Sequence, residues 1–143
     1  ISWQADKDEV VTTLAKQFQK GVEGRNDFKN FTFIKADDLS FAKRLFEATA
    51  INLSRYVQDV KSVTPNWDPE RIGTVDLMII AQCLEEILTF EDIPVRVSLN
   101  EYIELSKHYG TPKSKDFVNG VLDRLVKRYT EENKIVKTGR GLV

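Results

Sequence analysis

The chain has few of the residues from which active sites and metal centres are built. Its 143 residues include one cysteine and one histidine, whereas metal sites usually need several thiolate or imidazole ligands. A glycine-rich phosphate loop, a His-Glu-x-x-His pair and a Gly-x-Ser-x-Gly elbow are all missing from the sequence. These absences favour a binding protein over an enzyme, and they predict that no metal or cofactor is bound.

The single cysteine and the single histidine have structural explanations. Cys83 stands among Ile79, Ile80 and Leu84, which predicts a buried thiol rather than a nucleophile. His108 lies at the end of a predicted helix, where a partial positive charge suits the helix dipole. A chain that cannot form an internal disulfide fits a reducing compartment, so we expect it in the cytoplasm.

Long hydrophobic runs are missing as well. No run approaches the roughly 18 to 20 apolar residues that a membrane helix needs, so we expect no membrane segment. With 41% hydrophobic and 30% charged residues, the composition is typical of one globular domain, which we place over residues 1–133. The chain begins with Ile rather than Met, so we expect a fragment with residues missing upstream. Residues 134–143 lack periodicity, which predicts a flexible C-terminal tail.

Charge is distributed unevenly along the chain. The formal net charge is −1, which by itself argues against a general nucleic-acid binder. Residues 1–100 contain 12 Lys and Arg against 16 Asp and Glu, whereas residues 101–143 contain 9 against 6. The C-terminal part could therefore meet phosphate groups, although a modest excess of lysine is more often a solvated face.

Apolar residues recur at intervals of three and four along most of the chain, which is the period of amphipathic helices. We predict an all-α fold, a compact antiparallel bundle of about five helices, over residues 6–20, 38–63, 68–89, 98–109 and 114–133. Ser98 and Glu101 have the spacing of a capping box at the start of the fourth helix. Ser114 is expected to cap the last helix.

Three of these helices have clear predicted faces. The helix over 68–89 is apolar nearly all round, which predicts a place in the middle of the bundle. Its adjacent acids, Glu85 and Glu86, point in different directions and are expected to be solvated. The predicted buried stripe of the helix over 38–63 is Ala42, Leu45, Phe46, Leu53, Tyr56, Val57 and Val60. That of the last helix is Val118, Val121, Leu122, Leu125 and Tyr129.

Asn119 and Gly120 stand inside the last predicted helix, although neither residue favours a helix interior. Glycine there costs roughly 1 kcal/mol relative to alanine. We expect Gly120 to let this helix approach the apolar helix around Ile79 and Cys83, while Asn119 bonds a neighbouring backbone group.

Two motifs give the chain a family resemblance. Residues 92–107 read DIPVRVSLNEYIELSK, with Asn100 and Glu101 at their centre, and residues 117–123 read FVNGVLD, with Asn119 and Gly120. Together they resemble the pattern of the NusB family, and a weaker similarity extends over residues 38–130. The family consists of small all-helical transcription antitermination factors, which agrees with the predicted fold.

The resemblance implies an adaptor that carries out no bond chemistry. Members of the family pair with a small-subunit ribosomal protein, called NusE in this role, and together they grip the boxA segment of nascent ribosomal RNA. We therefore expect a role in transcription antitermination and ribosomal RNA biogenesis, with the same two partners and the transcription elongation complex. The sequence leaves open whether a homodimer forms.

Site residues follow from the resemblance only where the motifs align. Phe117 occupies the family position whose aromatic side lies against RNA, and its ring could stack on an unpaired base. A ring half-buried against the previous helix is an equal alternative. Lys113, Ser114 and Lys115 begin the same helix, where free backbone amides and cations favour phosphate.

Two acids of the 68–89 helix are expected to face the partner protein. Asp76 aligns with an acid that helps to hold the ribosomal protein, although a solvated carboxylate is the simpler alternative. Glu85 stands where the family usually has tyrosine, so the resemblance implies an altered partner-facing surface.

The chain also departs from the family at its beginning. The family starts with an arginine-rich helix that supplies much of the attraction for phosphate, and nothing resembling it is found in this sequence. RNA affinity of these residues alone should therefore be weak. Two other functions stay open: an RNA-binding module of a ribosomal RNA cytosine methyltransferase, and a NusB-fold scaffold that has lost RNA binding.

Overall fold

The computed structural model describes residues 36–65 and 72–142 of the chain. It divides the chain into two units, Ile1–Leu39 and Ser40–Val143, and nearly all described residues belong to the second. The elements are α2 (Ala36–Val63), α3 (Thr74–Thr89), α4 (Val95–Tyr109), α5 (Ser114–Glu131) and a short 3-10 helix, η3 (Gly139–Leu142). The described residues include no strand, so the predicted all-α fold is confirmed. The helix predicted over 6–20 and the helix start predicted at 68 lie outside the described residues.

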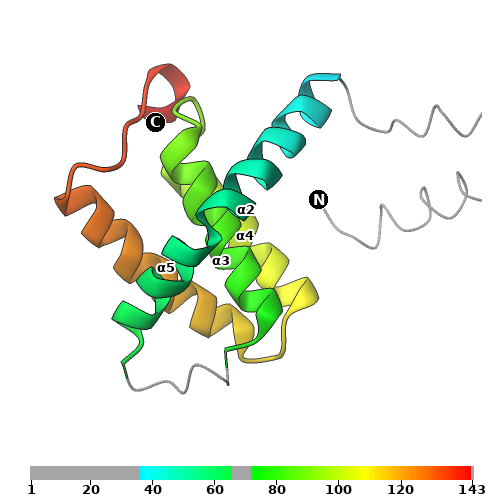
Figure 1. The fold of residues 1–143 in the computed structure, drawn as a ribbon, viewed down its shortest axis with the longest axis vertical. Coiled ribbons are helices and arrows are strands. Elements are labelled where there is room, and N and C mark those ends of the chain that lie inside the picture. The colour runs from blue at the N-terminus through cyan, green and yellow to red at the C-terminus, as the bar shows by residue number, and fades with distance from the viewer. Residues whose placement is uncertain (1–35, 66–71, 143) are drawn as a thin grey trace, which may run out of the picture. The chain divides into compact units, whose positions relative to one another are not determined.

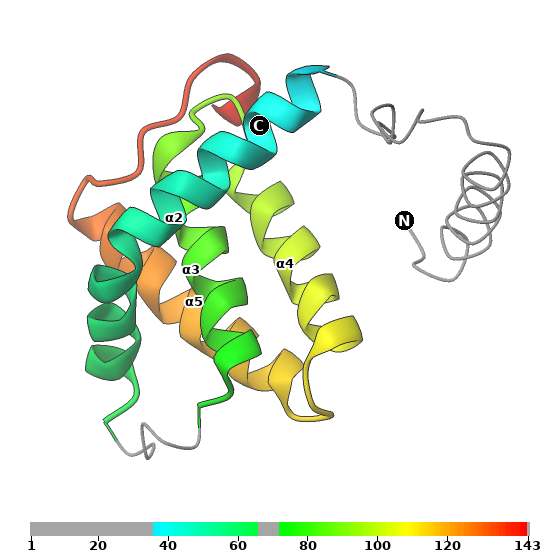
Figure 2. The ribbon, with the colours of Figure 1, turned by 45° about the vertical axis from the view of Figure 1, so that its right-hand side comes forward.

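The apolar helix α3 occupies the middle of the second unit. It packs against both α4 and α5, and α2 crosses over it (Figures 1 and 2). Nine of its 16 residues are buried, because a helix that is apolar on most sides needs neighbours on most sides. The central position predicted for this segment is therefore confirmed.

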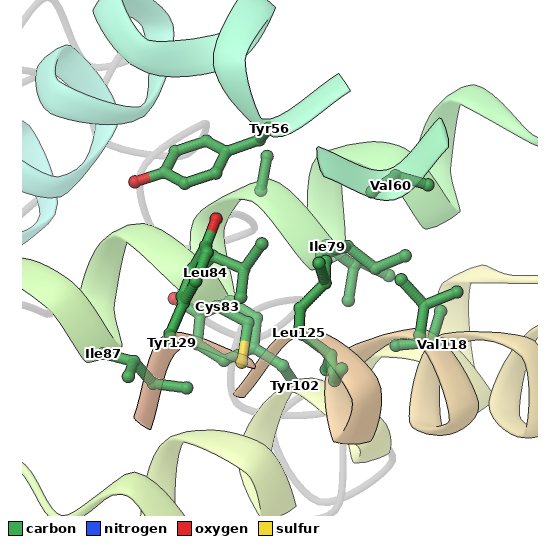
Figure 3. Packing of buried hydrophobic residues seen from close by; sticks show 14 residues of the cluster. Tyr56, Val60, Ile79, Cys83, Leu84, Ile87, Tyr102, Val118, Leu125 and Tyr129 are labelled. Atoms are coloured by element: carbon green, nitrogen blue, oxygen red, sulfur yellow. The ribbon is translucent and has the colours of Figure 1, made fainter. Parts of the chain in front are cut away.

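Each of the four α-helices within the described residues contributes to one hydrophobic core (Figure 3). Cys83 lies within it with no exposed surface, and burial raises the pKa of its thiol, so the predicted buried cysteine is confirmed. The predicted inward stripe of α5 is also confirmed, since all five of its members are buried: Val118, Val121, Leu122, Leu125 and Tyr129.

The inward face of α2 is narrower than the sequence predicted. Leu45, Tyr56 and Val60 are buried as expected, but Phe46 is 66% exposed and Ala42 is also exposed. Phe46 follows Leu45 directly, and consecutive helical residues point about 100° apart. Both side chains of such a pair cannot face the same neighbouring helix, so the inclusion of Phe46 in the buried stripe was wrong.

Helix α4 begins three residues earlier than its predicted capping box. Pro94 is the N-cap residue and no side chain caps the helix, whereas Ser98 lies inside the first turns and is fully buried. Its hydroxyl donates a hydrogen bond to Glu86 on α3, with 2.7 Å between Oγ and Oε1. The predicted box was therefore wrong, and its second member, Glu101, is an exposed residue in the middle of α4, like the adjacent Asn100.

The two adjacent acids of α3 are buried, not solvated as predicted. Glu85 is 3% exposed and faces α2. Its Oε2 accepts hydrogen bonds from Asn52 Nδ2 at 2.9 Å and from the Tyr56 hydroxyl at 2.6 Å, and its Oε1 accepts one from Thr89. Burial and the hydrogen bond to Glu85 raise the pKa of the Tyr56 hydroxyl well above its ordinary value.

Glu86 is the corresponding buried acid on the side of α4. Its carboxylate accepts hydrogen bonds from Ser98 at 2.7 Å and from the Tyr102 hydroxyl at 3.0 Å. The pKa of Tyr102 is raised by burial and by the nearby Glu86 charge. The prediction that neighbouring acids would not share a site is confirmed, because Glu85 joins α3 to α2 and Glu86 joins α3 to α4.

The C-terminal residues, predicted to form a flexible tail, pack against the turn between α3 and α4 (Figure 1). The Thr138 amide donates to the Glu91 carbonyl at 3.0 Å, and Lys137 Nζ donates to the Phe90 carbonyl at 2.8 Å. A Cβ at Gly141 would lie 1.9 Å from the Glu91 carbonyl oxygen, so only glycine fits there. Backbone groups of this turn thus receive hydrogen bonds from the tail.

Candidate RNA and partner-protein surfaces

The turn between α4 and α5 sets the position of the predicted RNA residues. Gly110 ends α4, and a Cβ added to it would lie 2.3 Å from the Cβ of Ser114. Ser114 is 1% exposed, and its Oγ accepts the Thr111 amide at 2.7 Å. The serine therefore holds the turn together. Its backbone amide donates to the Thr111 carbonyl at 2.9 Å, so neither the amide nor the buried side chain of Ser114 is available for the predicted RNA contact.

Lys113 and Phe117 lie on one face at the start of α5. They are four residues apart, so their side chains stand above one another on the helix surface. Lys113 is exposed, and Phe117 is half-buried with its ring packed against the edge of the core. The half-buried alternative for Phe117 is therefore confirmed, and stacking of its ring on an RNA base stays a prediction.

Lys115 does not share the face of Phe117. Residues two apart on a helix point to nearly opposite sides, and Lys115 lies close enough to Glu104 on α4 to act on that carboxylate. The pKa of Glu104 is lowered first by its hydrogen bond with Lys107, and the charges of His108 and Lys115 lower it further. Lys115 thus belongs to the exposed charged surface between α4 and α5.

The structure does not support the packing explanation for Gly120. No described atom lies within 4 Å of a Cβ built at this position. The glycine is therefore not needed for the close approach of α5 to α3, and that prediction was wrong. Asn119 is exposed, and its side chain makes no hydrogen bond to another described residue. The predicted bond from Asn119 to a neighbouring backbone group is likewise not observed.

Asp76, the predicted partner contact on α3, is only 8% exposed. The simpler alternative of a solvated carboxylate is therefore wrong. Its Oδ1 has no hydrogen-bond partner among the described residues, and Gly73 at the helix N-cap lies beside the carboxylate. A buried acid with an unpaired oxygen is costly, so this position has spare capacity to accept a hydrogen bond.

Glu85, the other predicted partner residue, is a core residue. Its carboxylate is buried and accepts three hydrogen bonds from within the bundle. The prediction of a partner-facing Glu85 is contradicted by this burial. The sequence did not indicate that Glu85 is buried, because its hydrogen-bond donors Asn52 and Tyr56 belong to α2, about 30 residues earlier in the chain.

An apolar groove between α3 and α4 was not predicted. It has a volume of about 380 Å³ and is lined chiefly by Val75, Met78, Ile79, Leu105 and Tyr109. Val75 and Met78 are 45% and 39% exposed, although both belong to the apolar helix predicted for the middle of the bundle. The one available signal is their offset from Ile80 and Cys83, because helical residues five positions apart point to different faces.

A second, polar pocket opens where α2, the end of α3 and the end of α5 meet. It has a volume of about 370 Å³ and includes the side chains of Arg55, Asp59, Glu85 and Lys134. Both acids are already hydrogen-bonded, Asp59 to Arg128 and Tyr129 and Glu85 as described above. Two cations and two acids face this space, so its charge favours neither a cationic nor an anionic ligand.

Within the described residues, no group of three or more His, Cys, Asp or Glu side chains is placed to hold a metal ion. None of the described helices has the length and apolar character to cross a membrane.

Comparison with known proteins decides the family. The sequence model of the NusB family matches residues 2–127. The chain belongs to the NusB family. The resemblance carried by residues 92–107 and 117–123 is thereby confirmed, and so is the NusB-like character of the all-α fold.

Individual relatives agree with this assignment. A transcription antitermination protein NusB of Salinibacter ruber is 36% identical over 141 residues, covering 96% of this chain and 88% of the relative. A protein of the same name from Clostridium botulinum is 40% identical over 93 residues, or 65% of each chain. The solved structure of T. maritima NusB matches 70% of each chain with a TM-score of 0.63 and 32% identity. The expectation of a transcription antitermination protein thus agrees with the names of these relatives.

Proposed function

We propose that this chain acts in transcription antitermination as an adaptor that binds RNA together with a small-subunit ribosomal protein in the role of NusE. The observation that carries the proposal is the family match over residues 2–127. The proposed RNA is a boxA-type segment of a ribosomal RNA leader, bound within the transcription elongation complex in the cytoplasm. Adaptor function of this kind needs two binding surfaces and no catalytic group.

The proposed RNA surface is the start of α5. Phe117 is only partly buried and packs against the core, which restricts the orientation of its ring. A fixed aromatic ring stacks on an unpaired base with little loss of conformational freedom. Lys113, one turn earlier on the same face, supplies a positive charge for phosphate.

The proposed protein surface is the N-terminal end of α3 with the groove beside it. Asp76 is 8% exposed and its unpaired Oδ1 is buried, so a partner side chain would bond this oxygen only after a local rearrangement at the start of α3. The neighbouring groove presents partly exposed Val75, Met78 and Leu105, and exposed apolar surface with polar groups nearby is typical of protein interfaces. Asp76 would fix the orientation of the partner, while the groove would supply buried apolar area.

A NusB-fold scaffold without RNA binding is the second candidate. It is favoured by the burial of Ser114 and by the position of Lys115 beside Glu104, because both leave the start of α5 with fewer contacts for phosphate. The two candidates predict the same protein partner and differ in RNA binding alone.

The experiment measures binding of a fluorescently labelled, single-stranded boxA RNA by anisotropy, with the full chain and a saturating amount of the ribosomal protein. We expect Phe117→Leu, which keeps apolar volume but removes the ring, to weaken binding by roughly 5- to 150-fold, the equivalent of one lost stacking contact. Phe46→Leu is the matched control, since Phe46 is exposed on α2.

Each outcome separates the candidates. If the complex binds no RNA at about 50 mM salt, where electrostatic attraction is strong, the chain is a scaffold and the RNA role is refuted. If the ribosomal protein itself does not bind, the adaptor role as a whole is wrong. An equal loss in Phe117→Leu and Phe46→Leu would remove the proposed stacking contact.

A further inference from the structure

The end of α3 is rich in negative charge. Glu85 and Glu86 are buried near this end, and Glu91 and Asp92 follow in the turn to α4. The last turn of α3 contains no basic residue. The carbonyl end of a helix carries a partial negative charge of its own, so acids are unfavourable there unless a cation lies nearby. Any compensating cation comes from another part of the chain.

Residues 134–142, which we call the strap, bring cations to this helix end. The strap lies against the turn between α3 and α4 (Figures 1 and 2). Its three basic residues, Lys134, Lys137 and Arg140, follow one another at intervals of three. Lys134 lines the polar pocket that includes Glu85, and Arg140 lines a cavity of about 470 Å³ that includes Glu86. The strap thus has a cation on each side of α3.

Lys137, the middle cation, lies at the helix end itself. Its Nζ donates to the carbonyl of Phe90, the C-cap residue of α3, at 2.8 Å. Burial lowers the pKa of this lysine, whereas the negative charges of Glu86, Asp92 and Glu91 raise it. A lysine that is close to these acids and bonded to the carbonyl end of α3 supplies the charge that the last turn of the helix lacks.

Little apolar surface holds the strap in place. Of its three large apolar side chains, Ile135 packs partly against the core, whereas Val136 and Leu142 are 52% and 73% exposed. Segments with few buried apolar contacts open at a lower free energy than the core of the same domain. The attachment of the strap therefore depends mainly on its polar contacts.

The charged contacts of the strap are unequal. Lys134 pairs with its near neighbour Glu132 at the end of α5. Arg140 and Asp92 are both exposed and 4.0 Å apart, and exposed ion pairs of this kind contribute little. Lys137 is partly buried and bonds the helix end directly, so it is the charged residue on which the strap depends most.

We propose that residues 134–142 form a releasable strap, held on the end of α3 chiefly by Lys137, and that the strap opens while the helices stay folded. Opening frees the carbonyls of Phe90 and Glu91, which lie in the turn that precedes α4. Loss of the Lys137 charge shifts the strap towards the open state. This device depends neither on RNA binding nor on a ribosomal protein.

Hydrogen exchange of the full chain, followed for single amides by NMR, tests the proposal. The Thr138 amide, which bonds the Glu91 carbonyl, reports on the strap, and the amide of the buried Ile80 reports on α3. In the wild type we expect Thr138 to be protected at least about 100-fold less than Ile80. Added urea should accelerate Thr138 exchange much less than Ile80 exchange, because opening of the strap alone exposes little surface.

Substitutions of Lys137 test what holds the strap. Lys137→Met removes the charge and the donor but keeps a long side chain, and we expect Thr138 exchange to become roughly 3- to 10-fold faster. Lys137→Arg keeps the charge, so exchange should stay within about twofold of the wild type by the same scale. Lys127→Met, at an exposed lysine on α5, is the matched control and should leave Thr138 exchange unchanged.

Three results would overturn the proposal. A wild-type Thr138 amide with the protection and urea dependence of Ile80 would mean that the strap opens only when the whole domain unfolds. Unchanged Thr138 exchange in Lys137→Met would show that Lys137 does not hold the strap. An equal acceleration in Lys137→Met and Lys137→Arg would mean that the fit of the lysine side chain matters and its charge does not.

Discussion

Gly120 lies well inside α5, six residues after Ser114 and eleven before Glu131. At such a position glycine is less favourable than alanine by about 1 kcal/mol, since it leaves the unfolded chain more freedom and adds no contacts to the helix. The Cβ of alanine would meet no described atom within 4 Å, so no clash opposes the gain. We therefore expect Gly120→Ala to raise the free energy of unfolding by about 1 kcal/mol.

Urea unfolding followed by circular dichroism measures this change, and the melting temperature should rise by roughly 3 to 6 °C for a domain of this size. Gly141→Ala is the matched control, because its Cβ would clash with the Glu91 carbonyl oxygen at 1.9 Å and should lower stability. A Gly120→Ala protein that unfolds more easily than the wild type would refute the reasoning. It would mean that the backbone at Gly120 is in close contact after all.

Two further predictions concern stability. Tyr56→Phe removes a hydrogen bond to a buried carboxylate, Glu85, and should cost roughly 1.5 to 3 kcal/mol in urea unfolding; a cost below 0.5 kcal/mol, by the same order-of-magnitude scale, would mean that Asn52 and Thr89 alone satisfy the acid. The raised pKa of Tyr102 predicts that the fold loses stability in alkali. Below about pH 10, the ordinary pKa of tyrosine, the folded and the unfolded chain both keep the phenol proton. Above that pH the unfolded chain loses the proton first. Stability should therefore fall as pH rises above about 10, and Tyr102→Phe should reduce that fall when unfolding is measured across this range.

The periodic features of the fold could be predicted from the sequence. In α5 the buried residues recur at intervals of three and four, and the stripe from Val118 to Tyr129 was predicted completely. The same rule located α3, because an apolar segment of this length can be satisfied only in the middle of a bundle. These predictions depend on residues within one helix, and helical geometry relates such residues to one another wherever the helix packs.

The buried acids could not be predicted in this way. Glu85 and Glu86 resemble surface residues when their sequence neighbours alone are considered, and their hydrogen-bond donors lie on other helices. Tyr56 precedes Glu85 by 29 residues, and Tyr102 follows Glu86 by 16. Local patterns carry no information on such pairs, since the pairs exist only after the helices have packed.

Ser98 and Glu101 show that residues with the spacing of a capping box need not mark the start of a helix. Their spacing fits a capping box, but the box requires the helix to begin at the serine. Pro94 is the N-cap residue four positions earlier, and the buried carboxylate of Glu86 takes the Ser98 hydroxyl. A long-range hydrogen bond to a buried acid outweighs an optional cap, because a buried carboxylate oxygen without a donor would cost more.

The predicted RNA residues are close neighbours in the sequence, but in the structure their side chains point in different directions. Ser114 faces the turn and Lys115 faces α4, whereas Lys113 and Phe117 share a face because they are four residues apart. Gly120 lies near this face as well, with the exposed Asp116 and Asp123 one turn before and one turn after it. The unusual Asn119-Gly120 pair therefore has no packing reason among the described residues: a glycine needed for internal packing would meet other helices, and Gly120 meets none of them.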